Sequence, residues 1–222
     1  MHKILINGAW VDALTDTSRE IKNPAMLKLL GTVADCKPLC EAVDCVDWVA
    51  ACFEYYGEVA RSSYGNSVPP VAPHQLNFTI KEPFGVVAAI VPFNFPLLLM
   101  AWKVAPAIAA GNTVICKPPH QNPLSNLKLA EVYDLLPAGV VNVVTGAADT
   151  GTALVEHPDV DLIAFTGSNA VGRKIAAAAC ATAASGVSSG PRGSTHSASP
   201  STCTWTGSWS ANPGSFRTAS AR

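Results

Sequence analysis

Between residues 86 and 183, short uninterrupted apolar runs alternate with longer segments whose apolar positions have helical spacing. The apolar runs predict strands at 86–91, 113–117, 140–145 and 162–166. The segments after each of them predict helices at 96–111, 125–135, 150–157 and 169–183. Strands that are apolar on both faces and alternate with helices are typical of a parallel sheet. We therefore predict an α/β fold with a Rossmann-like parallel sheet, helices on both faces, and ligands at the carboxyl ends of the strands.

The N-terminal third of the chain predicts three further elements. Asn7-Gly8 lies between two short β-prone runs in residues 4–11, a strong local signal for a hairpin. Residues 42–60 predict a surface helix with one buried stripe, formed by Val43, Val46, Val49, Ala50, Phe53 and Ala60. Three prolines between residues 69 and 73 predict an extended connection, after which the alternating residues 76–80 predict a half-exposed strand.

The longest apolar stretch, residues 84–110, has the hydropathy of a membrane span. It is interrupted by Pro92, Asn94, Pro96 and Lys103, whose polar groups or missing backbone donors would need partners in lipid. We therefore interpret this stretch as a buried strand, a turn and a helix, and expect no membrane association.

Composition narrows the function classes. The chain has 222 residues, of which 49% are hydrophobic and only 14% charged, so disorder does not describe it as a whole. A formal net charge of −1 leaves no basic surplus for neutralising phosphates, which argues against a nucleic-acid binder. The first residues show no secretory signal, so the seven cysteines predict reduced thiols in a cytoplasmic protein. Four of them lie close together without metal-ligand spacing, and we expect buried small side chains and no metal site at Cys36, Cys40, Cys45 and Cys52.

Residues 185–222 differ in kind from the rest of the chain. They are mostly Ser, Gly, Thr, Ala and Pro, and they contain no Asp, Glu, Lys, Leu, Ile or Met. Such a composition cannot build a core, so we predict a disordered low-complexity tail after a folded unit of residues 1–184.

A small group of residues that could bind a ligand or take part in catalysis follows each predicted strand. The groups are at 92–96, 117–120, 146–148 and 165–168. Because parallel strands end at the same edge of a sheet, these groups are expected to meet at one rim. Each has a structural alternative when taken singly. Asn94 suits a turn, Lys117 a solvated charge, and Gly167-Ser168 a helix cap. Their joint order and spacing are more specific.

Two segments carry a resemblance to a known family. Gly111-Asn112-Thr113-Val114 followed by Lys117-Pro118, and Phe165-Thr166-Gly167-Ser168 followed by Val171-Gly172, resemble cofactor-domain signatures of the aldehyde dehydrogenase family. The resemblance covers residues 1–184 and implies an incomplete NAD(P)-binding domain. Family members are homo-oligomers that oxidise a small aldehyde to a carboxylic acid with NAD or NADP. A cysteine attacks the carbonyl, hydride leaves to the nicotinamide, and a glutamate-activated water releases the acyl group.

The resemblance implies roles for individual residues. Asn94 matches the asparagine whose side-chain amide helps to hold the oxyanion of the intermediate. Lys117 matches the lysine that reaches the adenosine ribose. Gly167 and Ser168 match the turn that lets the backbone approach the pyrophosphate at a helix start. The remaining cofactor-binding residues are expected to be Pro92, Phe93, Phe165 and Val171.

His120 departs from the family pattern, because members that prefer NAD commonly carry a glutamate at this place. That carboxylate repels the 2′-phosphate of NADP, so a histidine makes the use of NADP possible. The structural alternative is a solvent-facing histidine after two prolines. We count His120 among the cofactor-binding residues, and the choice between NAD and NADP stays open.

The resemblance breaks in two places. Residues 23–34 resemble the family's early strands, but residues 37–42 resemble a segment that normally comes later, so we expect an internally shortened chain. Toward the C-terminus the resemblance fades near Ala184, before the family's general-base glutamate and nucleophilic cysteine, and most of its oligomerisation element is missing as well. Two interpretations follow. One is an NAD(P)-dependent aldehyde dehydrogenase. The other is a truncated, catalytically inactive remnant that binds at most a dinucleotide or a full-length relative.

Overall fold

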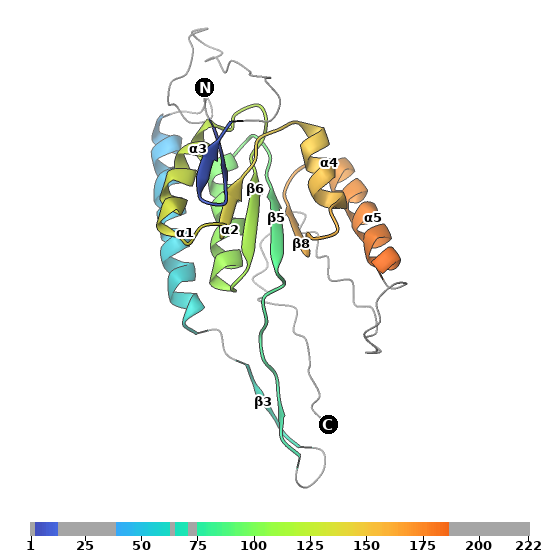
Figure 1. Ribbon diagram of the computed structural model, residues 1–222. Helices are drawn as coiled ribbons and strands as arrows, with labels where there is room; N and C mark the ends of the chain where they lie inside the picture. The colour runs from blue at the N-terminus through green and yellow to red at the C-terminus, as the bar shows by residue number, and fades with distance from the viewer. Residues whose placement is uncertain (1–2, 13–38, 63–64, 71–74, 187–222) are drawn as a thin grey trace.

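The computed structural model describes residues 3–12, 39–62, 65–70 and 75–186. Its centre is a six-stranded sheet with the order β2-β1-β7-β6-β5-β8 (Figure 1). The strands are β1 (Ile4–Ile6), β2 (Ala9–Val11), β5 (Val86–Ile90), β6 (Thr113–Lys117), β7 (Val141–Val143) and β8 (Leu162–Phe165). The four strands predicted from apolar runs are all confirmed, and they are neighbours in this sheet. The predicted disordered tail and the family's early strands lie outside the described residues, except that the last helix continues to Gly186.

The pairing of the four central strands is parallel, as predicted. β5 lies between β6 and β8, and β7 follows on the other side of β6. Ile90 at the end of β5 is level with Lys117 at the end of β6 and with Phe165 at the end of β8. The carboxyl ends of these strands therefore form one rim.

The predicted N-terminal hairpin is present and adds two antiparallel strands to the sheet. Asn7 and Gly8 have φ angles of 50° and 72°, and two successive positive φ angles form the tight turn that matches the twist of a hairpin. Leu5 pairs with Val143 and is buried among the core residues, which joins β1 to the edge of β7. The sheet is therefore mixed, with a parallel centre and an antiparallel edge.

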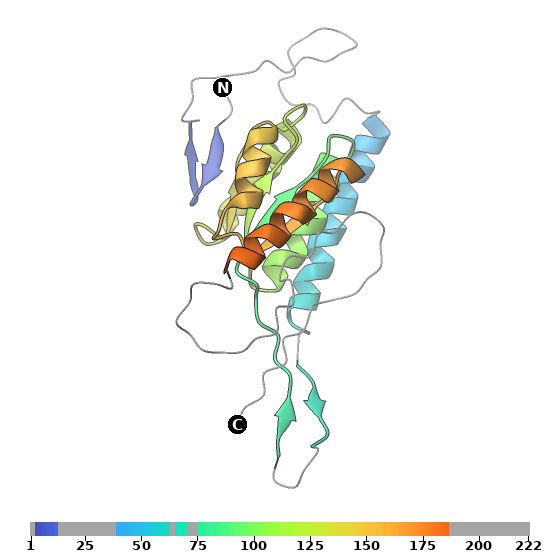
Figure 2. The same ribbon diagram turned by 90° about the vertical axis from the view of Figure 1, so that its right-hand side faces the viewer.

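Helices cover both faces of the sheet, as expected. α1 (Leu39–Ala60), α2 (Pro96–Ala109), α3 (Leu124–Ala130) and the 3-10 turn at Glu131–Leu135 lie on one face, while α4 (Ala148–Glu156) and α5 (Asn169–Gly186) lie on the other (Figures 1 and 2). Successive side chains of β5 alternate between two cores. Val87 and Ala89 pack beneath α2, whereas Ile90 packs with residues of α4 and α5. Burial on both faces explains the uninterrupted apolar runs.

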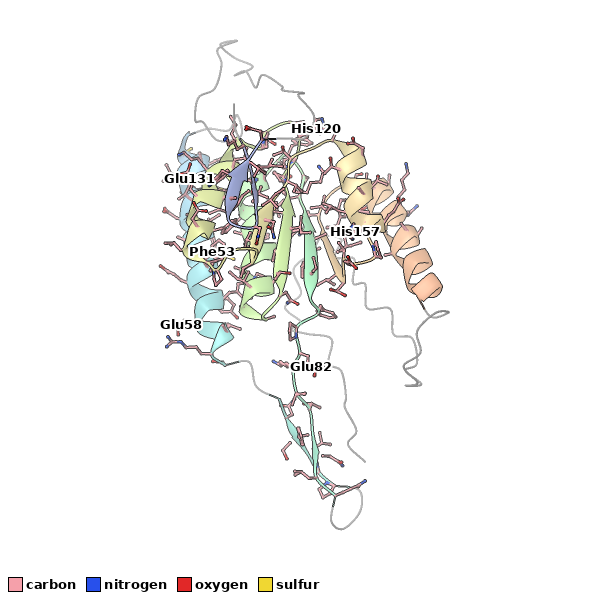
Figure 3. The ribbon with its side chains drawn as sticks, in the orientation of Figure 1. Phe53, Glu58, Glu82, His120, Glu131 and His157 are labelled. Carbon is pink, nitrogen blue, oxygen red and sulfur yellow. The ribbon has the colours of Figure 1, made fainter. Side chains whose placement is uncertain are left out.

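The buried stripe predicted for α1 is wrong in part. Val49 is buried, and Phe53, labelled in Figure 3, is half-buried. The centre of the Phe53 ring lies 6.4 Å from that of Tyr133. Other members of the predicted stripe, namely Val43, Val46, Ala50 and Ala60, are exposed, and Cys45 is buried instead. With about 100° between successive residues, Cys45, Val49 and Phe53 lie within an arc of about 80°. Val43 lies outside this arc, and Val46 lies at its border next to Phe53. The apolar surface of the helix is therefore wider than the side that is buried, which is centred on Cys45 and Val49.

The strand predicted at 76–80 is shorter in the structure. β4 (Asn77–Phe78) pairs only with β3 (Ser67–Val68), and the two form an arm that extends away from the sheet (Figures 1 and 2). Leu76 is 79% exposed and Phe78 51% exposed. No helix covers the described part of this arm, so the apolar residues of its alternating pattern are not buried on one face.

Polar side chains connect the elements at the amino end of the sheet. The buried Asn112 accepts a hydrogen bond from the Gly85 N–H at 3.0 Å and donates one to the Ala107 carbonyl at 3.0 Å. Asp161 accepts a hydrogen bond from the Val86 N–H at 2.8 Å. These bonds join the end of α2 and the start of β8 to the start of β5. Asn112 was part of the segment that resembles a cofactor signature, yet it lies at the end of the sheet opposite the rim.

We expect Asn112→Ala to lower the free energy of unfolding by about 1–3 kcal/mol, because it leaves the Gly85 N–H without its partner. The Ala107 carbonyl loses one of two hydrogen bonds and keeps the one from the backbone N–H of residue 112. Urea denaturation measures this change, with Asp44→Asn on the exposed face of α1 as the control. A loss no larger than that of the control would contradict the prediction.

Candidate functional site

The four residue groups singled out by the sequence lie at one rim of the sheet. Residues 92–95 follow β5, residues 118–120 follow β6, residues 146–148 lead into α4, and residues 166–168 lead into α5. Figure 3 shows His120 at this end of the molecule, whereas His157 lies at the opposite end of α4. The predicted convergence of the groups is thus present in the fold. The role of each residue stays a prediction.

Asn94 lies in a short exposed loop between two buried ends. Val91 before the loop and Pro96 after it are buried, while Phe93, Asn94 and Phe95 are exposed. Pro96 is the first residue of α2, where its fixed φ and missing N–H are well tolerated. Asn94 is therefore accessible at the rim, and Pro92 in the same loop is half-buried.

Lys117 ends β6 and its side chain runs toward α4. A side chain on Gly151 of α4 would contact the Cε atom of Lys117 at 3.6 Å, so the glycine leaves room for the lysine. The Lys117 Nζ donates a hydrogen bond to the Pro118 carbonyl at 3.4 Å. Burial lowers the pKa of Lys117, and the carboxylate of Asp149 acts in the opposite direction. The amine is thus held beside the first turn of α4, where its three N–H groups can donate to a hydroxyl or phosphate oxygen.

The turn after β8 combines a close approach with a helix cap. Phe165 is buried, and a side chain on Gly167 would collide with its ring. The Ser168 hydroxyl accepts a hydrogen bond from the Val171 N–H at 3.4 Å, which is the geometry of an N-cap of α5. Gly167-Ser168 therefore forms the helix cap that the sequence offered as a structural alternative. Val171 is 45% exposed on the first turn of the helix.

His120 is exposed after the two buried residues Pro118 and Pro119, which agrees with the solvent-facing alternative. Gly146 at the start of the turn into α4 has no room for a side chain, because a Cβ atom would collide with Thr150. The two turns at Gly146 and Gly167 each bring backbone close to the N-terminus of a helix, and helix N-termini favour anions.

Lys103 belongs to the rim as well, although sequence reasoning used it only against a membrane span. From α2 its Nζ donates a hydrogen bond to the Thr166 hydroxyl at 2.6 Å, just after β8. Burial lowers the pKa of Lys103 from 10.5 to about 8. The signal in the sequence was a single cation in a long apolar segment. The strand that it reaches is 63 residues away and is brought near only by the fold.

Burial raises the pKa of the thiols of Cys52 and Cys116. Cys116 is buried and burial raises its pKa well above the usual range, which confirms its interpretation as a core residue. Cys45 is buried and Cys52 half-buried, but Cys40 is exposed, which corrects the expectation for that position. Cys36 lies outside the described residues. Within the described ranges, no three or more His, Cys, Asp and Glu side chains gather as metal ligands would, and no helix is long and apolar enough to cross a membrane.

Comparison with known proteins shows the family of this chain. A sequence model described as "Aldehyde dehydrogenase family" matches residues 13–188. The chain belongs to the aldehyde dehydrogenase family. The match includes the described rim, and it confirms the resemblance seen in the sequence.

Relatives in this family are considerably longer than the chain. Betaine aldehyde dehydrogenase of Hordeum vulgare is 47% identical over 161 residues, which are 70% of this chain and 32% of that protein. The peroxisomal aminoaldehyde dehydrogenase 2 of Pisum sativum is 45% identical over 165 residues, covering 71% and 32%. The NADP/NAD-dependent aldehyde dehydrogenase PuuC of Escherichia coli K12 is 45% identical over 153 residues, covering 67% and 31%. The chain thus spans about a third of these relatives.

A solved structure confirms the fold. The crystal structure of an E. coli NADP-dependent enzyme superposes with a TM-score of 0.78 at 30% sequence identity. The superposition covers 82% of this chain and 50% of the other. The family's cofactor-domain fold is therefore present in this chain.

The lowered pKa of Lys103 predicts a pH-dependent stability. The folded protein holds the Lys103 proton less tightly than the unfolded chain, so this residue makes the fold more stable as pH rises from about 8 to 10.5. Between pH 7.5 and 9.5 we expect the free energy of unfolding of Lys103→Met to rise by about 1–2 kcal/mol less than that of the unmodified protein. Urea denaturation at the two pH values measures it, with Lys128→Met on the exposed side of α3 as the control. Parallel profiles for the protein and the Lys103 variant would overturn this prediction.

Proposed function

We propose that the rim binds a nicotinamide dinucleotide and forms part of an aldehyde dehydrogenase that oxidises a small aldehyde to a carboxylic acid. The observation that carries the proposal is the position of Lys117. Its amine is held at the carboxyl end of β6 beside the first turn of α4, in a chain whose family uses such a cofactor. Relatives named for betaine aldehyde and aminoaldehydes support a small aldehyde as the substrate class.

The residues at the rim fit a dinucleotide by their chemistry. Lys117 offers N–H donors to ribose hydroxyls, and the N-terminus of α5 offers backbone N–H groups and a favourable dipole to the pyrophosphate. At Gly167 a side chain would already collide with Phe165, so backbone alone borders the cofactor there. Exposed apolar surface at Phe93 and Val171 suits the flat faces of the bases. The bound cofactor supplies the hydride acceptor.

In this proposal Asn94 is the residue that acts on the reacting carbonyl. Its exposed side-chain amide donates to the oxygen as that oxygen gains negative charge, which lowers the barrier because a donor already in place needs no reorganisation. His120 brings no carboxylate to the ribose, so the 2′-phosphate of NADP meets no repulsion from this position. We propose that both NAD and NADP are accepted.

A second candidate function is binding without turnover. The observation that favours it is Cys116, the cysteine next to Lys117, whose buried thiol has a raised pKa and is a poor nucleophile. In this version residues 1–184 form the dinucleotide-binding unit, and the chain binds the cofactor or associates with a full-length homologue. Mixing the chain with a short aldehyde and NAD or NADP separates the two functions. NADH or NADPH formation that is abolished by thiol alkylation supports turnover, and retained binding without it supports the second function.

The thiols and the net charge bear on the compartment and on possible partners of the chain. A cytoplasmic location agrees with the reduced thiols, while the Pisum sativum relative is named as peroxisomal, so the compartment of this chain stays a prediction. We propose no nucleic-acid partner, because the net charge is −1.

We expect Lys117→Ala to weaken NAD and NADP binding by about 1–3 kcal/mol, which corresponds to a loss of about 5- to 150-fold in affinity. Isothermal titration calorimetry with each dinucleotide measures the loss. Lys128→Ala is the matched control, because it removes the same charge from an exposed site on α3, where the lysine pairs with Glu131 at the surface. Equal affinities for the protein and the Lys117 variant would remove Lys117 from the site.

A further inference from the structure

The loop that carries Asn94 is held from a neighbouring loop. The Asn122 side-chain amide donates a hydrogen bond from Nδ2 to the Phe93 carbonyl at 2.8 Å. Phe93 follows β5, and Asn122 follows β6, which are adjacent parallel strands. The bond therefore joins two loops of the rim that are 29 residues apart in the chain.

This hydrogen bond acts on the peptide group that leads into Asn94. The described peptide bonds are all trans, so fixing the direction of the Phe93 carbonyl also fixes the Asn94 N–H on the opposite side. The position of the Asn94 Cα atom follows from the same peptide plane. The hydrogen bond therefore fixes the backbone of this exposed loop right beside Asn94.

Asn122 itself is attached to rigid structure. Pro123 comes directly after it, has a φ of −77°, and accepts a hydrogen bond from the Leu127 N–H of α3 at 3.0 Å. On its N-terminal side, Pro118 and Pro119 are buried. A donor placed between a proline pair and a helix start has few alternative positions.

The other half of the Asn122 amide shows which interaction decides its orientation. Its Oδ1 atom is buried and has no hydrogen-bond partner among the described residues. Leaving a buried acceptor unpaired costs free energy, but reversing the amide would place that oxygen against the Phe93 carbonyl, which accepts and cannot donate. The side chain thus keeps Nδ2 on the Phe93 carbonyl, although Oδ1 then has no hydrogen-bond partner among the described residues.

We propose that Asn122 is a positioning residue that orients Asn94 through the Phe93 carbonyl. The hydrogen bond stands on the geometry alone. Only the catalytic meaning of orienting Asn94 rests on the proposed function, since an oxyanion donor is effective when its position is fixed before the reaction.

Nuclear magnetic resonance relaxation on the full chain tests the proposal through the Asn94 backbone amide. In the unmodified protein we expect an order parameter near that of rigid backbone, about 0.85, and in Asn122→Asp a value below about 0.6. Aspartate keeps the shape of asparagine and is favourable at the start of α3, but at neutral pH it has no N–H to donate. The Phe93 carbonyl carbon shift is expected to move upfield in the same variant. Asn122→Ala gives a second variant without the donor, and Gln121→Ala in the same exposed turn is the matched control.

The outcomes separate a positioning role from a structural one. Increased loop motion in both Asn122 variants with an unchanged urea midpoint supports the proposal. An Asn94 order parameter that stays at the control's value overturns it, whether or not the midpoint falls. Calorimetry with NAD on the same samples tests the proposed function separately. If the unmodified protein binds neither NAD nor NADP, the proposed function fails, while the relaxation result still decides whether Asn122 holds the loop.

Discussion

The parallel pairing of β5 with β6 and β8 is the constraint on which the rest of the structure depends. It places Ile90, Lys117 and Phe165 at one level, and the loops that carry Asn94, His120 and Gly167 follow these strand ends. Because a parallel sheet is buried on both faces, the same pairing also requires α2 on one side and α4 with α5 on the other. Fold and site therefore share one cause, the adjacency of strands that are apolar on both faces.

Few polar side chains interrupt this apolar interior, and those that do join elements that packing alone would leave free to slide. At the amino end of the sheet Asn112 and Asp161 hold the start of β5. At the carboxyl end Lys103 reaches Thr166, and Asn122 reaches Phe93. Hydrogen bonds are directional whereas apolar contacts are not, so these side chains set positions within the limits that burial allows. The β3–β4 arm differs from the rim, because within the described part of the chain its strands pair only with each other.

Structural roles and proposed functional roles coincide at several rim positions. Ser168 caps α5 with its hydroxyl, and the same turn brings backbone to the rim. Gly167 is required by the Phe165 ring before any ligand is considered. Lys117 is buried for most of its length and still reaches the first turn of α4. Replacing any of these residues changes local structure together with the proposed binding. Asn122 and Lys103 each reach the rim through one hydrogen bond and are more informative positions to vary.

The sequence by itself determined the elements whose signals are local. Apolar runs placed the four central strands, Asn7-Gly8 placed the hairpin, and the spacing of residues 92–96, 117–120 and 165–168 pointed to the family and to one rim. Tertiary structure decided everything that depends on a distant partner. It selected Cys45 and Val49 as the buried side of α1, left β4 short on an uncovered arm, attached β1 to β7, and brought Lys103 to Thr166. The reason is physical: periodicity records which residues can be buried, whereas the surface that buries them, and the hydrogen bonds that a buried polar group must then find, come from residues far away in the chain.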